Sequence, residues 1–245
     1  MKLRRLAALA FVLGLAQGPA HAVVVITTGA ATNNIPGLTG FATTGAMMDG
    51  LSVTATFASG FSQTLLWADT GAQSGGVTGA GWSLSLDGDT FAAPWNFTNT
   101  RQGATGGPDA LNRLMLDGLN ALTVFDRTFG GLEGTPGSAA GNDWDCTGAP
   151  DICAVTGRVV RVQYDFQVSV GANAAVGDLW QTVAIDFCTA TEGPCIRNGV
   201  AGNWAFLQDT DNDARLTAAE PGSLALLGLA LGAAGWLSRR RKHAN

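Results

Sequence analysis

Apolar and polar residues alternate along much of the chain, which is the pattern of β-strands that bury one face. The longest example is residues 158–170, RVVRVQYDFQVSV, where apolar side chains at every second position from Val160 to Val170, Phe166 included, are expected to point into a core. Residues 51–57, LSVTATF, repeat the pattern. Shorter strand candidates are residues 62–68, 81–88, 121–126 and 179–187.

Turn-forming residues separate these segments. The chain contains 34 glycines, and Gly, Asn or Asp bound most of the strand candidates, as turns require. Apart from a candidate helical turn near residues 109–116, the body shows no amphipathic helix. We therefore predict one all-β body over residues 23–218, a β-sandwich of the jelly-roll type. Two smaller sandwiches are the alternative, with the break in the Gly-, Ala- and Ser-rich linker 130–143.

The N-terminus has the three parts of a secretory signal peptide. Three cations precede an apolar stretch over residues 6–16, and residues 20–22, Ala-His-Ala, have the small-x-small form of a cleavage site. We predict that residues 1–22 form a signal helix, removed after Ala22, and that the body is exported.

The C-terminus ends in an apolar run and a cationic cluster. Residues 223–237 carry no charge, and Arg239, Arg240, Arg241 and Lys242 follow them. A helix of this length rises about 22 Å, short of a hydrocarbon core of roughly 30 Å, so the arginines are expected to snorkel. Because a basic cluster after the last span stays cytoplasmic, this transmembrane helix leaves the body outside.

The tail resembles a known sorting domain. Glu220 and Pro221, the apolar span and the terminal arginines are similar to the PEP-CTERM tail of exported proteins in Gram-negative bacteria that make exopolysaccharide. The resemblance covers residues 219–245. It implies recognition by an exosortase-type transpeptidase at the inner membrane, cleavage near the motif, and transfer of the body to the cell surface or extracellular matrix. Where the family has Pro-Glu-Pro, this chain has Ala219-Glu220-Pro221.

The charge and composition of the body exclude several classes of function. Between Val23 and Glu220 the chain has seven arginines, no lysine, no histidine and 19 acidic residues, a net charge of −12. Nucleic-acid binding is excluded because it needs clustered cations. Ser-His-Asp catalysis, Cys-His catalysis and His-ligated zinc all need an imidazole that this body lacks. Divalent cations and neutral sugars suit an acidic exported body.

Four cysteines form two pairs with the same spacing. Cys146 and Cys153 enclose one turn-like segment, and Cys188 and Cys195 enclose another. In an oxidising compartment two local disulfides are the natural interpretation, although four cysteines permit three connectivities.

Acidic residues near the end of the body have the spacing of a calcium loop. Asp209, Asp211 and Asp213 match positions 1, 3 and 5 of an EF-hand loop, and Glu220 matches position 12. An alanine replaces the glycine that the loop needs, and Pro221 disfavours a helical Glu220. Calcium is the candidate cofactor, a solvated acidic stalk is the alternative, and Glu220 is assigned first to sorting.

Other acids and aromatics are candidates for sugar chemistry. Asp143 and Asp145 flank Trp144, and two carboxylates beside an aromatic ring can serve a glycoside hydrolase, although such neighbours usually sit in turns. Trp95 and Trp144, both in loop-like sequence, are the candidate sugar contacts. Asp87-Gly88 is interpreted as a hairpin turn.

Together these features predict an exported, non-enzymatic protein of the cell surface or extracellular matrix, structural or associated with exopolysaccharide. The alternative is a secreted carboxylate-dependent glycoside hydrolase or lyase that acts on matrix polysaccharide. The expected partners are the exosortase-type transpeptidase, the membrane through the C-terminal helix, and exopolysaccharide.

Overall fold

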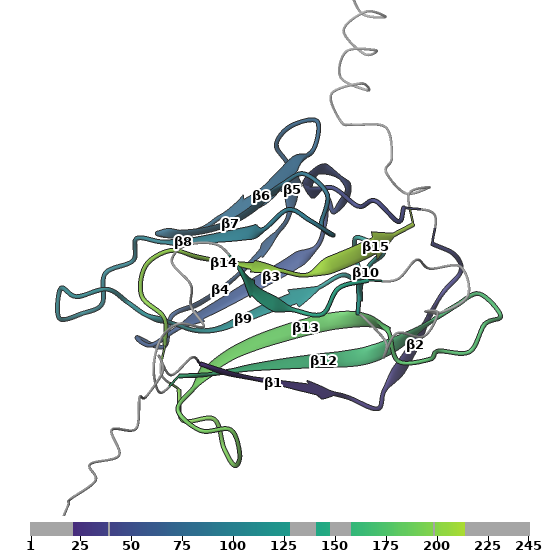
Figure 1. Cartoon of the computed structure of the whole chain (residues 1–245). Helices are drawn as coiled ribbons and strands as arrows, with labels where there is room; N and C mark the ends of the chain where they lie inside the picture. The colour runs from purple at the N-terminus through teal and green to yellow at the C-terminus, as the bar shows by residue number, and fades with distance from the viewer. Residues whose placement is uncertain (1–21, 39, 128–140, 148–157, 198, 214–245) are drawn as a thin grey trace, which may run out of the picture.

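The computed structural model describes residues 22–38, 40–127, 141–147, 158–197 and 199–213 (Figure 1). This part of the chain is all-β: beside its strands it contains one short 3-10 helix, Gly45–Met47, and no α-helix. The strands form two sheets with a shared hydrophobic core, as in a β-sandwich. The predicted signal helix, most of the linker 130–143 and the sorting tail lie outside the described residues.

The first sheet has nine strands. Its main path is β1–β12–β13–β9–β3–β4, with β2 also on β12, and with β10 between β13 and β15. Most neighbours are antiparallel, but β1 and β2 run parallel to β12. The strands are β1 Val23–Thr28, β2 Thr32–Ile35, β3 Ser52–Phe57, β4 Ser62–Leu66, β9 Leu111–Asp117, β10 Thr123–Asp126, β12 Val159–Val170, β13 Leu179–Cys188 and β15 Asp209–Asn212.

The second sheet has six strands in the order β11–β14–β8–β7–β6–β5. Both sheets draw strands from before and after segment 130–143, so the two halves of the chain share one sandwich. The strands are β5 Ala68–Asp69, β6 Ser74–Thr78, β7 Trp82–Asp87, β8 Trp95–Asn99, β11 Asp145–Thr147 and β14 Trp204–Leu207.

The alternating pattern places the expected side chains in the core. Along β3, Val53 and Ala55 are fully buried and Phe57 is 1% exposed, whereas the serine and threonines between them are only partly covered. The other segments predicted as strands form β4, β7, β10 and β13. The all-β prediction is therefore confirmed for the described part of the chain.

Phe166 departs from the pattern. Its side chain is 41% exposed and its φ is +58°, a left-handed conformation that bulky residues rarely adopt. The pairing of β12 with β1 and β2 changes register here: Thr28 lies opposite Tyr164, but Thr32 lies opposite Gln167. The segment that joins β1 to β2 therefore has one residue more than the stretch of β12 opposite it, as in a β-bulge. The prediction that Phe166 points into the core is wrong.

Two local predictions are also corrected. The candidate helical turn near residues 109–116 is wrong, because Leu111–Asp117 forms β9, paired with β13 on one side and β3 on the other. Its apolar residues Leu114 and Leu116 are fully buried. Asp87-Gly88 begins the connection of a hairpin, since β7 and β8 are antiparallel partners, but the turn is not a tight one, because β7 ends at Asp87 and β8 begins only at Trp95.

Aromatic rings fill the space between the sheets. Trp204 of the second sheet meets Phe187 of the first edge-on, with ring centroids 5.3 Å apart. Trp95 stacks on Phe206 at 5.7 Å. Burial of large aromatic surface is a main source of stability in such a core. Its largest fully buried members include Trp67, Trp95, Trp144, Tyr164, Phe57, Phe97, Phe125, Phe187 and Phe206.

Within the described residues, no helix has the length and apolar character needed to cross a bilayer. The predicted span, residues 223–237, lies outside them.

Candidate functional site

Three aspartates meet where β10 pairs with β15. Asp126 lies opposite Asp209, and Asp211 lies opposite Val124. Alternate residues of a strand point to the same side, so Asp209 and Asp211 share one face, and the antiparallel register brings Asp126 beside them. Ligand oxygens of the three carboxylates all lie within 4.8 Å of one another. We call Asp126, Asp209 and Asp211 the acidic cluster.

The acidic cluster is almost completely buried, with exposed fractions of 1% for Asp126, 3% for Asp209 and 1% for Asp211. Burial raises the pKa of Asp209 to about 7, and the charge of Asp211 adds to the rise, against hydrogen bonds from Thr90 and Thr210 that favour the ionised form. Buried charge of one sign is costly unless it is neutralised. A bound proton or a bound cation can supply that neutralisation.

Thr90 orients Asp209 from the connection between β7 and β8. Its hydroxyl donates to Asp209 Oδ1 at 2.9 Å, and the backbone N–H of Thr210 donates to the same oxygen at 2.8 Å. Thr90 is fully buried. The carboxylate of Asp209 is therefore held by one donor from a connection in the second sheet and one from a strand of the first sheet. These two bonds fix its orientation within the acidic cluster.

Gln208 is the residue at which the chain passes from the second sheet to the first, between β14 and β15. Its side-chain amide donates to the carbonyls of Asp209 at 3.0 Å and Asp126 at 3.3 Å. The Tyr164 hydroxyl donates to the side-chain oxygen of Gln208, and Trp95 Nε1 donates to its backbone carbonyl at 2.9 Å. This buried network holds β10 and β15 in the register that forms the acidic cluster.

The residues of the predicted calcium loop do not begin an EF-hand loop in the structure. Residues 209–212 form strand β15 rather than the opening turn of an EF-hand loop, because they pair with β10. Asp213 follows the strand and is 4% exposed, while Glu220 lies outside the described residues. Asp126 was missed by sequence reasoning; the only signal was its place at the end of a strand pattern.

The acidic cluster fits a hard divalent cation by its donor type. All three groups offer carboxylate oxygens, which are the ligands that Ca²⁺ prefers, and Ca²⁺ takes six to eight oxygens in flexible geometry. Three carboxylates supply part of such a shell and enough charge to balance the ion. These residues would hold the ion, and the ion would supply the positive charge that the buried acids require.

Asp109 is a buried carboxylate whose pKa is shifted in the opposite direction to that of Asp209. It is 3% exposed and accepts hydrogen bonds from the Ser59 backbone N–H at 3.0 Å, the Ser59 hydroxyl at 2.7 Å and Arg101 Nε at 3.2 Å. Burial acts to raise the pKa of Asp109, but the bonds from Ser59 and Arg101 outweigh it and hold the pKa below its ordinary value. Asp109 is thus an ionised structural anchor, unlike Asp209.

The two carboxylates of the candidate glycosidase pair, Asp143 and Asp145, lie in different surroundings. Asp143 forms an ion pair with Arg127, with Nε and Oδ1 2.9 Å apart, and the same guanidinium lies 4.8 Å from the centre of the Tyr164 ring. Asp145 is an exposed residue of β11, opposite Leu207. Arg127 therefore occupies one of the two carboxylates that a sugar-cleaving pair would need.

The candidate sugar contacts are corrected. Trp95 is fully buried in β8, and Trp144 is 2% exposed just before β11. Both rings stack on Phe206 inside the core. Neither side chain can stack on a sugar, so this prediction is wrong. Loop-like sequence around a tryptophan did not indicate exposure, because large rings are buried wherever the core has room.

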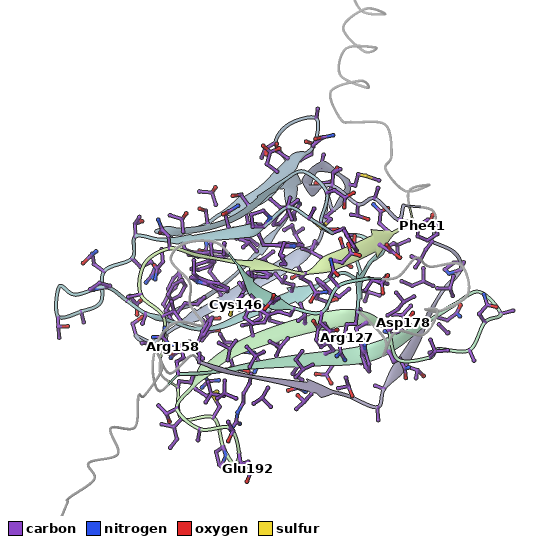
Figure 2. All side chains as sticks on the ribbon, in the orientation of Figure 1. Phe41, Arg127, Cys146, Arg158, Asp178 and Glu192 are labelled. Carbon is purple, nitrogen blue, oxygen red and sulfur yellow. A yellow bond between two sulfur atoms is a disulfide. The ribbon has the colours of Figure 1, made fainter. Side chains whose placement is uncertain are left out.

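Cys188 and Cys195 form a disulfide that closes the loop after β13, with Cα atoms 5.2 Å apart. This confirms one of the two predicted bridges. Figure 2 shows Glu192 within this loop, projecting away from the sheets. Arg161 of β12 secures the loop by donating to the carbonyls of Ala190 and Gly193 at 2.7 Å each. The predicted bridge from Cys146 involves Cys153, which lies outside the described residues.

Compared with known proteins, the chain matches no family model, no curated protein and no solved structure.

Proposed function

We propose that this chain is an exported, non-enzymatic β-sandwich protein, sorted by an exosortase-type transpeptidase to the cell surface or the extracellular matrix. The observation that carries the proposal is the Cys188–Cys195 disulfide, because structural disulfides form and persist in oxidising compartments outside the cytosol. It agrees with the signal-peptide pattern of residues 1–22 and the sorting-type tail of residues 219–245.

Calcium is the proposed structural cofactor, with the acidic cluster as its site. The support is the convergence of Asp126, Asp209 and Asp211 within 4.8 Å in a buried setting. An ion there would join β10 to β15 and stabilise the junction between the two sheets. Extracellular modules bind calcium at dissociation constants as weak as about 10⁻⁴ to 10⁻³ M, so a site of this kind suits a matrix protein.

Association with exopolysaccharide remains part of the proposal on general grounds. The body carries a net charge of −12, which favours a neutral glycan over an acidic one. The jelly-roll form of the sandwich is likewise a proposal. It is supported by two facing sheets built mostly from antiparallel strands, while the parallel pairing of β1 and β2 with β12 is a departure from that form.

Sorting can be tested in cells that express the full chain. Fractionation followed by mass spectrometry of the C-terminus should find a surface protein cut near Glu220, and Glu220→Gln should leave the tail attached. Ala219→Pro, which completes the Pro-Glu-Pro motif, is the matched variant and should be processed at least as well as the parent. An intact tail on the surface protein, or normal processing of Glu220→Gln, would contradict the proposal.

The second candidate function is a carboxylate-dependent glycoside hydrolase or lyase. It rests on the abundance of acids in the body, and the acidic cluster is the closest group of them. Burial of all three side chains separates them from a polymeric substrate. Release of reducing sugar from the producer's own polysaccharide by the purified protein, lost in Asp209→Asn, would favour this function over the structural one.

A further inference from the structure

Strand β1 is an edge strand of the first sheet (Figure 1). Its six residues, Val-Val-Val-Ile-Thr-Thr, are all β-branched and uncharged. Val23 is 49% exposed and Val24 36% exposed. No strand among the described residues pairs with the outer side of β1. Natural proteins usually protect such an edge with lysine, proline or an inward charge, and β1 has none of these.

The direction of the backbone groups follows from the pairing with β12. The N–H of Val23 donates to the Arg158 carbonyl at 3.1 Å, and the N–H of Gly29 donates to the Tyr164 carbonyl at 2.7 Å. In a parallel ladder alternate residues face the neighbouring strand, so odd-numbered residues of β1 face β12. The N–H and C=O groups of Val24, Ile26 and Thr28 therefore point outward.

We infer that this edge pairs with β1 of a second copy of the chain, antiparallel and across a two-fold axis at Ile26. Outward-facing residues then meet each other: Ile26 lies opposite its own counterpart, and Val24 lies opposite Thr28 of the second copy. This register makes about six backbone hydrogen bonds between the copies. It joins the two first sheets into one continuous sheet.

A second copy fits this edge better than a foreign strand for two reasons. The sequence is self-complementary in this register, because every cross-strand pair joins two β-branched residues, which pack well on a pleated surface. The edge is also a neutral strip on a body of net charge −12, so two copies meet there without apposing like charges. Salt should strengthen the association by screening the remaining repulsion.

Proline substitution tests the edge directly. Val24→Pro removes an outward N–H and no bond to β12, whereas Val24→Thr keeps the N–H and the β-branched shape. Light scattering on the detergent-solubilised full chain should give about twice the protomer mass for the parent and for Val24→Thr, and the protomer mass for Val24→Pro. A protomeric parent, or an unchanged mass in Val24→Pro, overturns the inference.

A charge pair tests the register and does not depend on proline. Val24→Asp with Thr28→Asp sets acids opposite each other in both pairs and should give protomers, while Val24→Asp with Thr28→Lys sets opposite charges together and should restore the dimer. Both residues are exposed, so neither change disturbs the core. Equal masses for the two double variants would overturn the proposed register.

Discussion

Asp126 faces Asp209 across the antiparallel pairing of β10 and β15, and both side chains are at most 3% exposed. Two carboxylates in such a position repel each other unless a proton or a cation lies between them. Gln208 supports the register that apposes them, because its side-chain amide donates to the backbone carbonyls of both residues. Protons and cations are therefore expected to affect the stability of this pairing.

Stability should depend on pH through Asp209. Its pKa is about 7 in the folded state against an ordinary value of 3.8, so between these values the native state holds a proton that the unfolded state has lost. The contribution of Asp209 to the free energy of unfolding should therefore be largest below about pH 4 and fall as pH rises to 7, by on the order of 4 kcal/mol in the presence of a chelator. Urea unfolding at several pH values measures this. Asp209→Asn should remove that part of the slope, and an identical slope in both proteins would contradict the assignment.

Calcium should stabilise the protein through the acidic cluster. A concentration 100 times the dissociation constant contributes about 2.7 kcal/mol, seen as a higher melting temperature. Asp126→Asn should abolish the increase, because it removes one of the three carboxylates. Two control variants should keep the calcium-dependent rise in melting temperature: Glu220→Gln, and Asp143→Asn at the carboxylate that pairs with Arg127. Full retention in Asp126→Asn would exclude this cluster as the site.

Asp109→Ala should destabilise the domain by roughly 3 kcal/mol, because it leaves the partly buried Arg101 without its carboxylate and two Ser59 donors without an acceptor. Denaturant unfolding gives the value. Asp145→Ala, at an exposed strand position, is the comparison and should change stability by less than about 0.5 kcal/mol. Similar losses in the two variants would show that the Asp109 contacts contribute little.

Removal of the Cys188–Cys195 bridge by paired serine substitutions should lower the free energy of unfolding by about 2 to 3 kcal/mol, since the bridge closes a short loop in the unfolded chain. Peptide mapping without reductant should recover Cys188 joined to Cys195. The same map tests the predicted Cys146–Cys153 bridge. A peptide that joins Cys146 to Cys188 or Cys195 would refute both pairings.

Phe166→Asn should raise the free energy of unfolding by about 1 kcal/mol, because asparagine tolerates the left-handed backbone better than phenylalanine does. Little packing is lost, since the ring is 41% exposed. Val168→Asn, two residues along β12 and fully buried, should be strongly destabilising in the same assay. A clear loss of stability in Phe166→Asn would show that the exposed ring makes contacts that matter.

The strands were predictable because their signal is local. Burial of one sheet face imposes a period of two on the sequence, as in β3 and β7. β4, β10 and β13 also form within segments predicted as strands, although β10 and β13 are buried on both faces. The bridge between Cys188 and Cys195 was predictable for the same reason, since a short spacing around a turn brings the two thiols together. The acidic spacing also singled out Asp209 and Asp211, which are two of the three members of the acidic cluster.

Only the tertiary structure decided which distant residues meet. Asp126 joins Asp209 because β10 and β15 pair in one register, and no local pattern encodes that register. Trp95 and Trp144 are buried because segments from both sheets close over them, although their own sequence is typical of loops. Phe166 is exposed and has a positive φ at the point where the pairing of β12 changes register between β1 and β2. Periodicity determines which strands form, whereas pairing between strands far apart in the chain determines which side chains share a site.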